Sequence, residues 1–223
     1  MCAPAIFLLL AGFAFEARAF QAEHPLTGRH IAPVMGVGGA DWLDRNERAE
    51  EEHPEVALDE LDLKAGMVVA DVGAGTGYMS LRMAKRVGPG GKVFAVDVQP
   101  EMLRRLRQNA AKAKLTNVET VLGTESDPKL PAGSVDLILL VDVYHEFSQP
   151  QKMLRGMREA LKPDGRLVLL EYRKEDPSIP IRPEHKMSVQ EVKTEVEAEG
   201  FKLSRVSEKL PRQHILILTK APN

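Results

Sequence analysis

The sequence predicts an α/β fold: a seven-stranded, mostly parallel sheet with an antiparallel last strand and helices on both faces. Strand-like and helix-like segments alternate five times up to residue 172, which is typical of a parallel sheet covered on both sides. The segment 135–141 is entirely apolar apart from one aspartate, as expected of a strand buried on both faces. Leu210-Pro211-Arg212 joins the last two strand-like segments, and so short a link favours a hairpin.

The expected elements follow the chain in order. Helical spacing of apolar residues at 56–63 precedes a strand at 67–72, and a helix at 79–87 ends at a Gly-Pro-Gly-Gly run. Pro100 stands where proline favours the first turn of a helix, here 100–114. The turn 163–165 introduces the fifth strand. The remaining expected elements are strands at 92–98, 118–122, 135–141, 166–172, 201–207 and 213–219, and helices at 151–161 and 188–199.

Length and composition indicate one globular domain with a short extension. The chain has 223 residues, of which 43% are hydrophobic and 28% charged. The net charge of -2, with basic residues interleaved among acids, disfavours nucleic acid as the main partner. The single cysteine, Cys2, excludes an internal disulfide and a cysteine-based zinc site.

The N-terminus has the features of a signal peptide. The apolar run 6–15 is too short to span a bilayer, and Ala17-Arg18-Ala19 matches an A-x-A cleavage pattern, although no Lys or Arg precedes the run. We therefore expect a signal peptide at 1–19, an exported (periplasmic or secreted) mature chain and no stable membrane span. The alternative is a hydrophobic N-terminal helix that packs on the domain or lies on a membrane, with the protein in the cytoplasm.

A glycine-rich loop follows the first expected strand. It reads D-x-G-x-G-x-G from Asp71 to Gly77, and glycine at alternate positions allows positive φ and a close approach of a ligand to the backbone. The third glycine comes one residue earlier than in a dinucleotide fingerprint. Asp97 ends the next strand about 20 residues further on, the place expected of a carboxylate that binds ribose hydroxyls.

This pattern resembles motif I of the class I S-adenosylmethionine-dependent methyltransferases, and the resemblance extends from about residue 55 to the C-terminus. It implies a Rossmann-like methyltransferase domain at 55–223, with 20–54 as an N-terminal linker and lid, and S-adenosylmethionine as cofactor. Glu125 is the closer match to the acid that binds the adenine amino group in this family, with Asp127 as the second choice. The cofactor-binding residues that the resemblance implies are Asp71, Gly73, Ala74, Gly75, Gly77, Asp97, Val98, Glu125 and Asp142.

Within 20–54, we expect Trp42 to anchor the cover onto the domain, because aromatic residues mostly pack. The acidic run 50–52 is expected to form a solvated helix face.

The segment 141–147 follows the fourth strand, where the family contacts both cofactor and substrate. His145 suits a general base and Asp142 could orient it or bind substrate, so these two are the catalytic candidates. The alternative is that both only shape the loop and cap the next helix. Glu171 and Tyr172 could line the pocket, whereas His185 and His214 are expected to be structural, and no metal site is expected.

The expected activity is methyl transfer from S-adenosylmethionine to a small organic acceptor. The turn 161–167 resembles that of quinone-methylating and other small-molecule methyltransferases, although fold alone does not determine function. Two alternatives remain open: a non-catalytic S-adenosylmethionine-binding module and an NAD-dependent dehydrogenase. The expected partner is a small-molecule substrate and no nucleic acid, with no expectation for the oligomeric state.

Overall fold

The computed structural model describes residues 22–222. The expected signal peptide at 1–19 and its cleavage site lie outside the described residues. Within the described range, none of the helices combines the length and the apolar character needed to cross a bilayer.

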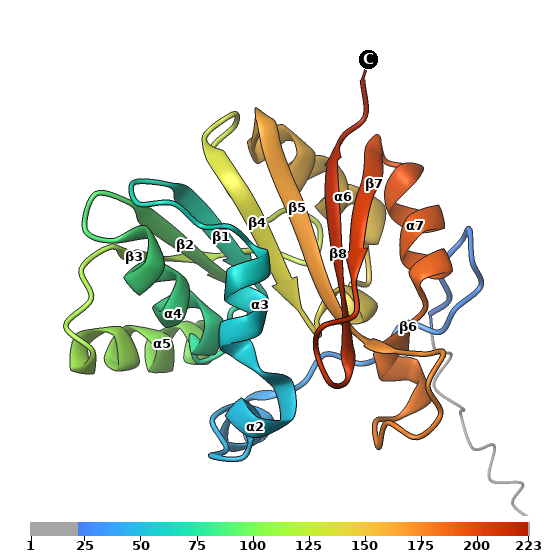
Figure 1. The fold of residues 1–223 in the computed structure, drawn as a ribbon, viewed down its shortest axis with the longest axis horizontal. Helices are drawn as coiled ribbons and strands as arrows, with labels where there is room; N and C mark the ends of the chain where they lie inside the picture. Colours follow the sequence, from blue (N-terminus) through green and yellow to red (C-terminus); the bar gives the residue numbers. More distant parts are fainter. Residues whose placement is uncertain (1–21, 223) are drawn as a thin grey trace, which may run out of the picture.

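One mixed sheet forms the centre of the molecule (Figure 1). Its strand order is β3-β2-β1-β4-β5-β8-β7, with β6 paired to β5 beside this path. Strands β1 to β5 are parallel, whereas β8 runs antiparallel to both neighbours. The strands are β1 (Val68–Val72), β2 (Lys92–Asp97), β3 (Val118–Leu122), β4 (Val135–Val141), β5 (Leu161–Arg173), β6 (Lys186–Met187), β7 (Phe201–Ser207) and β8 (Gln213–Lys220).

This topology confirms the predicted fold class, with β6 as an addition. A two-residue strand is too short to produce the alternation by which strands are found in a sequence. The helices are η1 (Val37–Gly39), α1 (Ala40–Leu43), α2 (Arg48–Glu52), α3 (Pro54–Glu60), α4 (Tyr78–Val87), α5 (Pro100–Lys112), η2 (Tyr144–Glu146), α6 (Pro150–Ala160), η3 (Pro183–His185) and α7 (Val189–Glu197).

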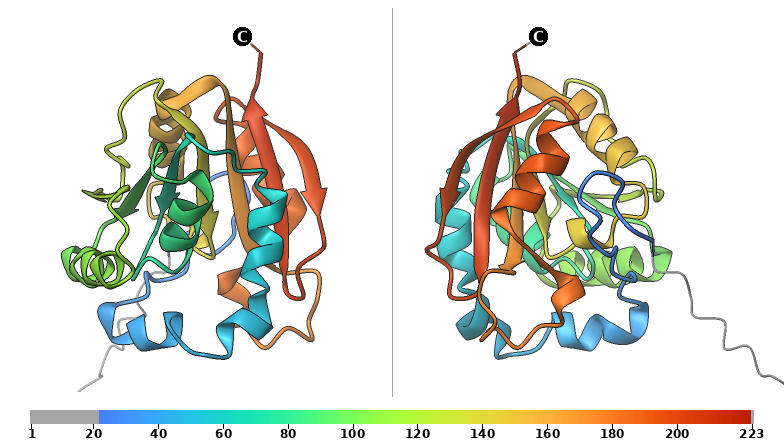
Figure 2. Two further views of the ribbon diagram at one scale, coloured as in Figure 1. Left: turned by 60° about the vertical axis from the view of Figure 1, so that its left-hand side comes forward. Right: turned by 90° about the vertical axis from the view of Figure 1, so that its right-hand side faces the viewer.

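Helices cover both faces of the sheet, and two apolar layers form the core. Leu137 and Leu139 of β4 face α3 and α4, whereas Ile138 and Leu140 face α6 and α7. All four leucine and isoleucine side chains are fully buried, which explains why β4 is a continuous apolar run. α5 lies beside α4 (Figures 1 and 2). α2 lies at the edge of the sheet where β4 and β5 end, whereas the first part of the described chain lies beside α7 (Figure 1).

The expected turn at 163–165 is instead an irregular part of β5. Leu161 already pairs with Val135, and pairing resumes between Arg166 and Leu137 after a shift in register. Residues 162–165 of β5 therefore lie opposite the single residue 136 of β4, and β5 bulges at this point.

Of two expectations for the N-terminal segment, one holds only in part and the other is wrong. Glu52 is only 5% exposed, because its carboxylate accepts hydrogen bonds from Arg45, Arg48 and the Tyr172 hydroxyl. The acidic run is therefore a solvated face only in part. Trp42 does not anchor the N-terminal segment onto the domain. It is 41% exposed, and the guanidinium of Arg45 stacks on its ring at 3.9 Å.

Candidate functional site

A cleft opens at the carboxyl ends of the parallel strands, where open α/β sheets bind ligands. The loops after β1, β2, β3 and β4 all contribute to it, and the N-terminal segment closes one side. Six residues expected from the sequence line this one cleft: Gly73, Gly75, Asp97, Val98, Glu125 and Asp142. The fold thus gathers residues separated by up to 69 positions in the chain.

The glycine loop is held against the neighbouring strand by its own backbone. The N–H groups of Gly73 and Ala74 both donate to the carbonyl oxygen of Val96, each at 2.9 Å. Gly73 has φ of 82°, and a Cβ at this position would lie 2.5 Å from Cγ2 of Val143. Glycine is therefore required here both by the backbone conformation and by the close approach of the loop after β4.

Asp97 is fixed at the floor of the cleft by two backbone amides. Gly75 donates its N–H to Oδ2 and Gln99 donates its N–H to Oδ1, each at 2.9 Å. Burial raises the pKa of Asp97, and these hydrogen bonds partly oppose the rise. Each carboxylate oxygen keeps a free lone pair for a ligand.

Asp71 lies in a smaller recess beside the cleft rather than on its main wall. The recess and the cleft share Leu43, Gly73, Gly75 and Val141 among their lining residues. Ser80 donates its hydroxyl to Oδ2 of Asp71. Burial raises the pKa of Asp71 from 3.8 to about 6, although the Ser80 hydrogen bond and the nearby Arg48 charge act in the opposite direction.

Arg48 is the charged residue of this recess that sequence reasoning missed. Its Nε donates to Glu52 at 2.8 Å, its Nη1 donates to the Leu43 carbonyl at 2.9 Å, and its guanidinium stacks on the Tyr78 ring at 4.1 Å. The side chain is thus oriented in advance beside Asp71. No motif marked it, because Arg48 comes from the N-terminal segment and reaches the recess only through tertiary folding.

Two residues considered for the cofactor, Gly77 and the second-choice Asp127, line neither the cleft nor the recess. Gly77 begins α4 with φ of 95° and packs against Leu106 of α5, so its glycine serves helix packing. Asp127 folds back on its own loop, where its carboxylate binds Lys129. Ala74 lines the smaller recess.

Of the two acids after β3, Glu125 is the one that faces the cleft, and the Ser148 hydroxyl donates a hydrogen bond of 2.9 Å to its carboxylate.

Asp142 faces the cleft at the end of β4. It has a positive φ of 50°, and its Oδ2 accepts a hydrogen bond of 2.7 Å from Nε2 of Gln213. Its Oδ1 is buried and has no hydrogen-bond partner among residues 22–222. Burial raises the pKa of Asp142 well above its ordinary value, reinforced by the charges of Glu52 and Glu171. A buried acceptor of this kind indicates a place for a ligand donor.

His145 does not line the cleft and is not oriented by Asp142. The residue is 2% exposed, and its Nδ1 lies 2.6 Å from Oε2 of Glu171, which is fully buried. Its Nε2 lies 3.1 Å from Nδ1 of His185. Glu171, which was expected to line the pocket, does not do so and instead orients His145. His185, which was expected to be structural, lies next to this catalytic candidate.

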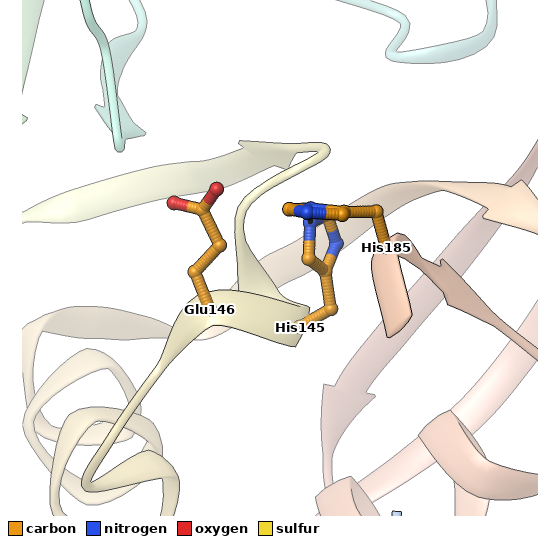
Figure 3. A group of neighbouring side chains, drawn as sticks. All are labelled: His145, Glu146 and His185. Atoms are coloured by element: carbon orange, nitrogen blue, oxygen red, sulfur yellow. Dashed lines mark hydrogen bonds between the residues drawn. The ribbon is translucent and has the colours of Figure 1, made fainter. Parts of the chain in front are cut away.

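Glu146 is a second residue that sequence reasoning missed. It lines the cleft, and burial raises its pKa to about 7, with the His145 charge as the largest opposing influence. Figure 3 shows Glu146 and His145 on the short helix η2, with His185 approaching from the opposite segment.

The N-terminal segment is joined to the cleft walls by hydrogen bonds. Met35 donates its N–H to Oε1 of Glu146 at 3.2 Å, and its carbonyl accepts from Nε2 of Gln99 at 2.9 Å. Further along, Thr76 of the glycine loop donates to Asp44 at 2.7 Å. Residues of this segment thus contact the loops after β1, β2 and β4.

Comparisons with known proteins agree with this geometry. Residues 63–213 match the model of the methyltransferase-domain family, so the chain belongs to that family. A solved S-adenosylmethionine-dependent methyltransferase from Aquifex aeolicus is 34% identical with a TM-score of 0.78, and the match covers 83% of this chain and 98% of that chain.

Curated relatives match over shorter stretches. The nocamycin O-methyltransferase of Saccharothrix syringae is 36% identical over 50% of this chain and 40% of its own length. A ubiquinone/menaquinone biosynthesis C-methyltransferase of Hahella chejuensis is 30% identical over 56% of this chain and 49% of its own length. The chain therefore covers about half or less of the length of these relatives.

Proposed function

We propose that this protein binds S-adenosylmethionine in the cleft and transfers its methyl group to a small organic acceptor. One observation carries the proposal: Asp97 stands in the cleft with both oxygens held by backbone amides and each with a lone pair free. That arrangement fits the two hydroxyls of a ribose. Glu125, which faces the same cleft after the next strand, suits the adenine amino group.

The smaller recess suits the amino-acid end of the cofactor. An ammonium group fits Asp71, and a carboxylate fits the Arg48 guanidinium, which is charged at all ordinary pH values. Because the recess shares the glycine loop with the cleft, one extended molecule would reach from Asp71 to Glu125 along that loop. The residues present therefore fit the cofactor that the family implies.

The bound cofactor supplies an electrophilic methyl group, which an acceptor atom attacks in a direct displacement. The protein's part is to hold the acceptor in line and, where the acceptor carries a proton, to receive it. Asp142 is better placed for this than His145, since Asp142 lines the cleft and His145 does not. Burial raises the pKa of Asp142, so its carboxylate accepts a proton more readily than an ordinary, solvated one.

The acceptor is proposed to be a small molecule with an apolar part. Val34 and Val98 line the cleft and are 49% and 39% exposed. Part of the cleft wall is therefore an apolar surface that an acceptor can contact. The absence of an excess of basic residues in the sequence argues against RNA or DNA as acceptor. The two curated relatives named above carry names of enzymes that act on small molecules, which supports the same class.

Isothermal titration with S-adenosylmethionine, followed by transfer of labelled methyl in a cell extract, tests the proposal. We expect binding of one cofactor per chain and a labelled small molecule separable by chromatography. Binding without any transfer would favour a non-catalytic binding module. Binding of NAD and not of S-adenosylmethionine would favour a dehydrogenase, and label in RNA or DNA would refute the small-molecule acceptor.

We also propose that residues 20–54 act as a lid over the domain at 55–223, and that residues 1–19 direct export. The hydrogen bonds of Met35 to both walls of the cleft support the first part. The A-x-A pattern ending at Ala19 supports the second. Mass spectrometry of the native protein should find a mature chain that begins at Phe20, and an intact N-terminus would refute export by cleavage.

A further inference from the structure

Three side chains with metal-binding atoms converge beside the cleft. They are His145 and Glu146 of η2 and His185 of η3, and one ligand atom from each lies within 4.8 Å of the other two. Figure 3 shows the two imidazoles nearly perpendicular, with the Glu146 carboxylate on the same side of the ribbon. The ring planes meet at 85°.

The spacing of the imidazole nitrogens suits a shared ion. Nε2 of His145 and Nδ1 of His185 lie 3.1 Å apart. Two nitrogens bound to one zinc at about 2.0–2.1 Å in a tetrahedral site are separated by about 3.3 Å, so small shifts would admit an ion between them. An oxygen of the Glu146 carboxylate lies within 4.8 Å of both histidine nitrogens, so it would have to move closer to share the ion.

A second observation points to a ligand independently: an outer carboxylate orients His145. Glu171 is fully buried, its Oε2 lies 2.6 Å from Nδ1 of His145, and its Oε1 accepts the N–H of Tyr144 at 2.9 Å. A carboxylate in this position holds the proton on Nδ1 and leaves the Nε2 lone pair directed at His185. Histidines that bind metals commonly carry such an outer carboxylate.

From these contacts we propose that His145, Glu146 and His185 form a binding site for a divalent transition-metal ion, with zinc as the representative. Two imidazoles and one carboxylate are a donor set of zinc and other imidazole-preferring metals. The site departs from the sequence-based expectation of no metal, because its ligands come from segments 39 residues apart. In the metal-free form, the Nδ1 proton of His185 occupies the space between the rings, and a change of tautomer moves it to Nε2 when the ion binds.

The site adjoins the place proposed for the methyl acceptor. Glu146 lines the cleft, so a coordination position not filled by the protein would face it. Coordination of the methyl acceptor by the bound ion rests on the function proposed above. Such coordination would favour acceptors that carry an oxygen or nitrogen donor near the methylated atom. The metal site itself does not depend on that function.

Zinc titration of the chelator-treated full-length protein, followed by calorimetry and by the visible spectrum with Co²⁺, tests the proposal. We expect about one ion per chain and the absorption bands of a low-coordinate Co²⁺ site. His185→Ala should abolish both, and Glu171→Gln should weaken zinc binding about 10- to 100-fold. His30→Ala, at an exposed histidine, and Cys2→Ser should leave both unchanged.

Absence of zinc binding in the wild type, or equal binding by the His185→Ala variant, would overturn the proposal. Circular dichroism should first establish that this variant is folded. If it is not, Glu146→Gln takes its place, and unchanged affinity together with an unchanged Co²⁺ spectrum would be equally decisive. Zinc binding without methyl transfer would support the metal site and count only against the proposed function.

Discussion

The backbone N–H of Gly75 donates to Oδ2 of Asp97 at 2.9 Å, which ties the glycine loop after β1 to the carboxylate that ends β2. This hydrogen bond joins two motifs that lie 22 residues apart in the sequence. The loop orients the carboxylate, and the carboxylate in turn fixes the loop against the edge of the sheet. A ligand that spans both therefore meets a preorganised surface.

Replacing Asp97 by Ala should weaken S-adenosylmethionine binding about 100- to 10,000-fold. The variant loses the acceptor for two ribose hydroxyls, and hydrogen bonds to charged groups contribute about 1.5–3 kcal/mol each. Calorimetry with the cofactor measures the change. Asp127→Ala is the matched control, since Asp127 binds Lys129 and does not face the cleft. Equal losses in both variants would contradict the assignment of Asp97 to the ribose.

Cofactor affinity should increase with pH between 5 and 7. The pKa of Asp71 is raised to about 6, so the carboxylate that would bind the ammonium is mostly protonated at pH 5 and mostly ionised at pH 7. The ionised fraction rises about tenfold over this range, and the affinity should follow it. Titrations at several pH values test this, and Asp71→Asn should be weaker and lose this component of the pH dependence. A flat profile in the wild type would speak against the role of Asp71.

The same raised pKa predicts that Asp71 lowers the stability of the folded protein at neutral pH. The pKa of this carboxyl group is about 6 in the folded protein and near 3.8 in the unfolded chain. Its contribution therefore lowers the free energy of unfolding as pH rises from about 4 to 6, and the full loss is present above pH 6. Asp71→Asn should therefore be more stable than wild type at pH 8, by on the order of 3 kcal/mol, and the gain should diminish toward pH 4. Urea unfolding at both pH values measures this. Asp164→Asn, at an exposed site, should show no such difference.

Gly73→Ala should destabilise the protein by about 2–6 kcal/mol. The new Cβ would have an unfavourable positive φ and would lie 2.5 Å from Cγ2 of Val143, and strain and overpacking each contribute about 1–3 kcal/mol. Gly133→Ala is the control for the backbone effect alone, since nothing lies within 4 Å of its added Cβ and its φ is also positive. Adding Val143→Ala to Gly73→Ala should recover part of the loss. No recovery in the double variant would show that the contact is not the cause.

The parts of the site that could be predicted from the sequence are those fixed by local backbone chemistry. Asp97 could be located because a strand end and a glycine loop place it, and the apolar run of β4 could be located because burial on both faces dictates it. Arg48 and His185 could not, because each reaches the site through packing of a segment with no regular pattern. Gly77 shows the converse: it belongs to the motif, yet the fold uses it for helix packing.

Arg29 and Glu195 form the buried contact that holds the N-terminal segment on the domain. Nε of Arg29 donates to Oε1 of Glu195 at 2.8 Å, Nη2 donates to Oε2 at 3.1 Å, and Nη1 donates to the His145 carbonyl at 3.1 Å. Both side chains are almost fully buried. The contact therefore connects the N-terminal segment to α7 and to the loop after β4.

Arg29→Met should destabilise the protein by about 3–5 kcal/mol, because it leaves the Glu195 carboxylate buried without its charged partner. Adding Glu195→Leu should restore much of the stability, since removing both charges avoids that desolvation cost. Chemical unfolding of the single and double variants measures this. Arg155→Met is the matched control: Arg155 pairs with Glu199, but its side chain is 64% exposed, so the loss should stay below about 1 kcal/mol. Equal losses for the buried and the exposed arginine would contradict the anchoring role of Arg29.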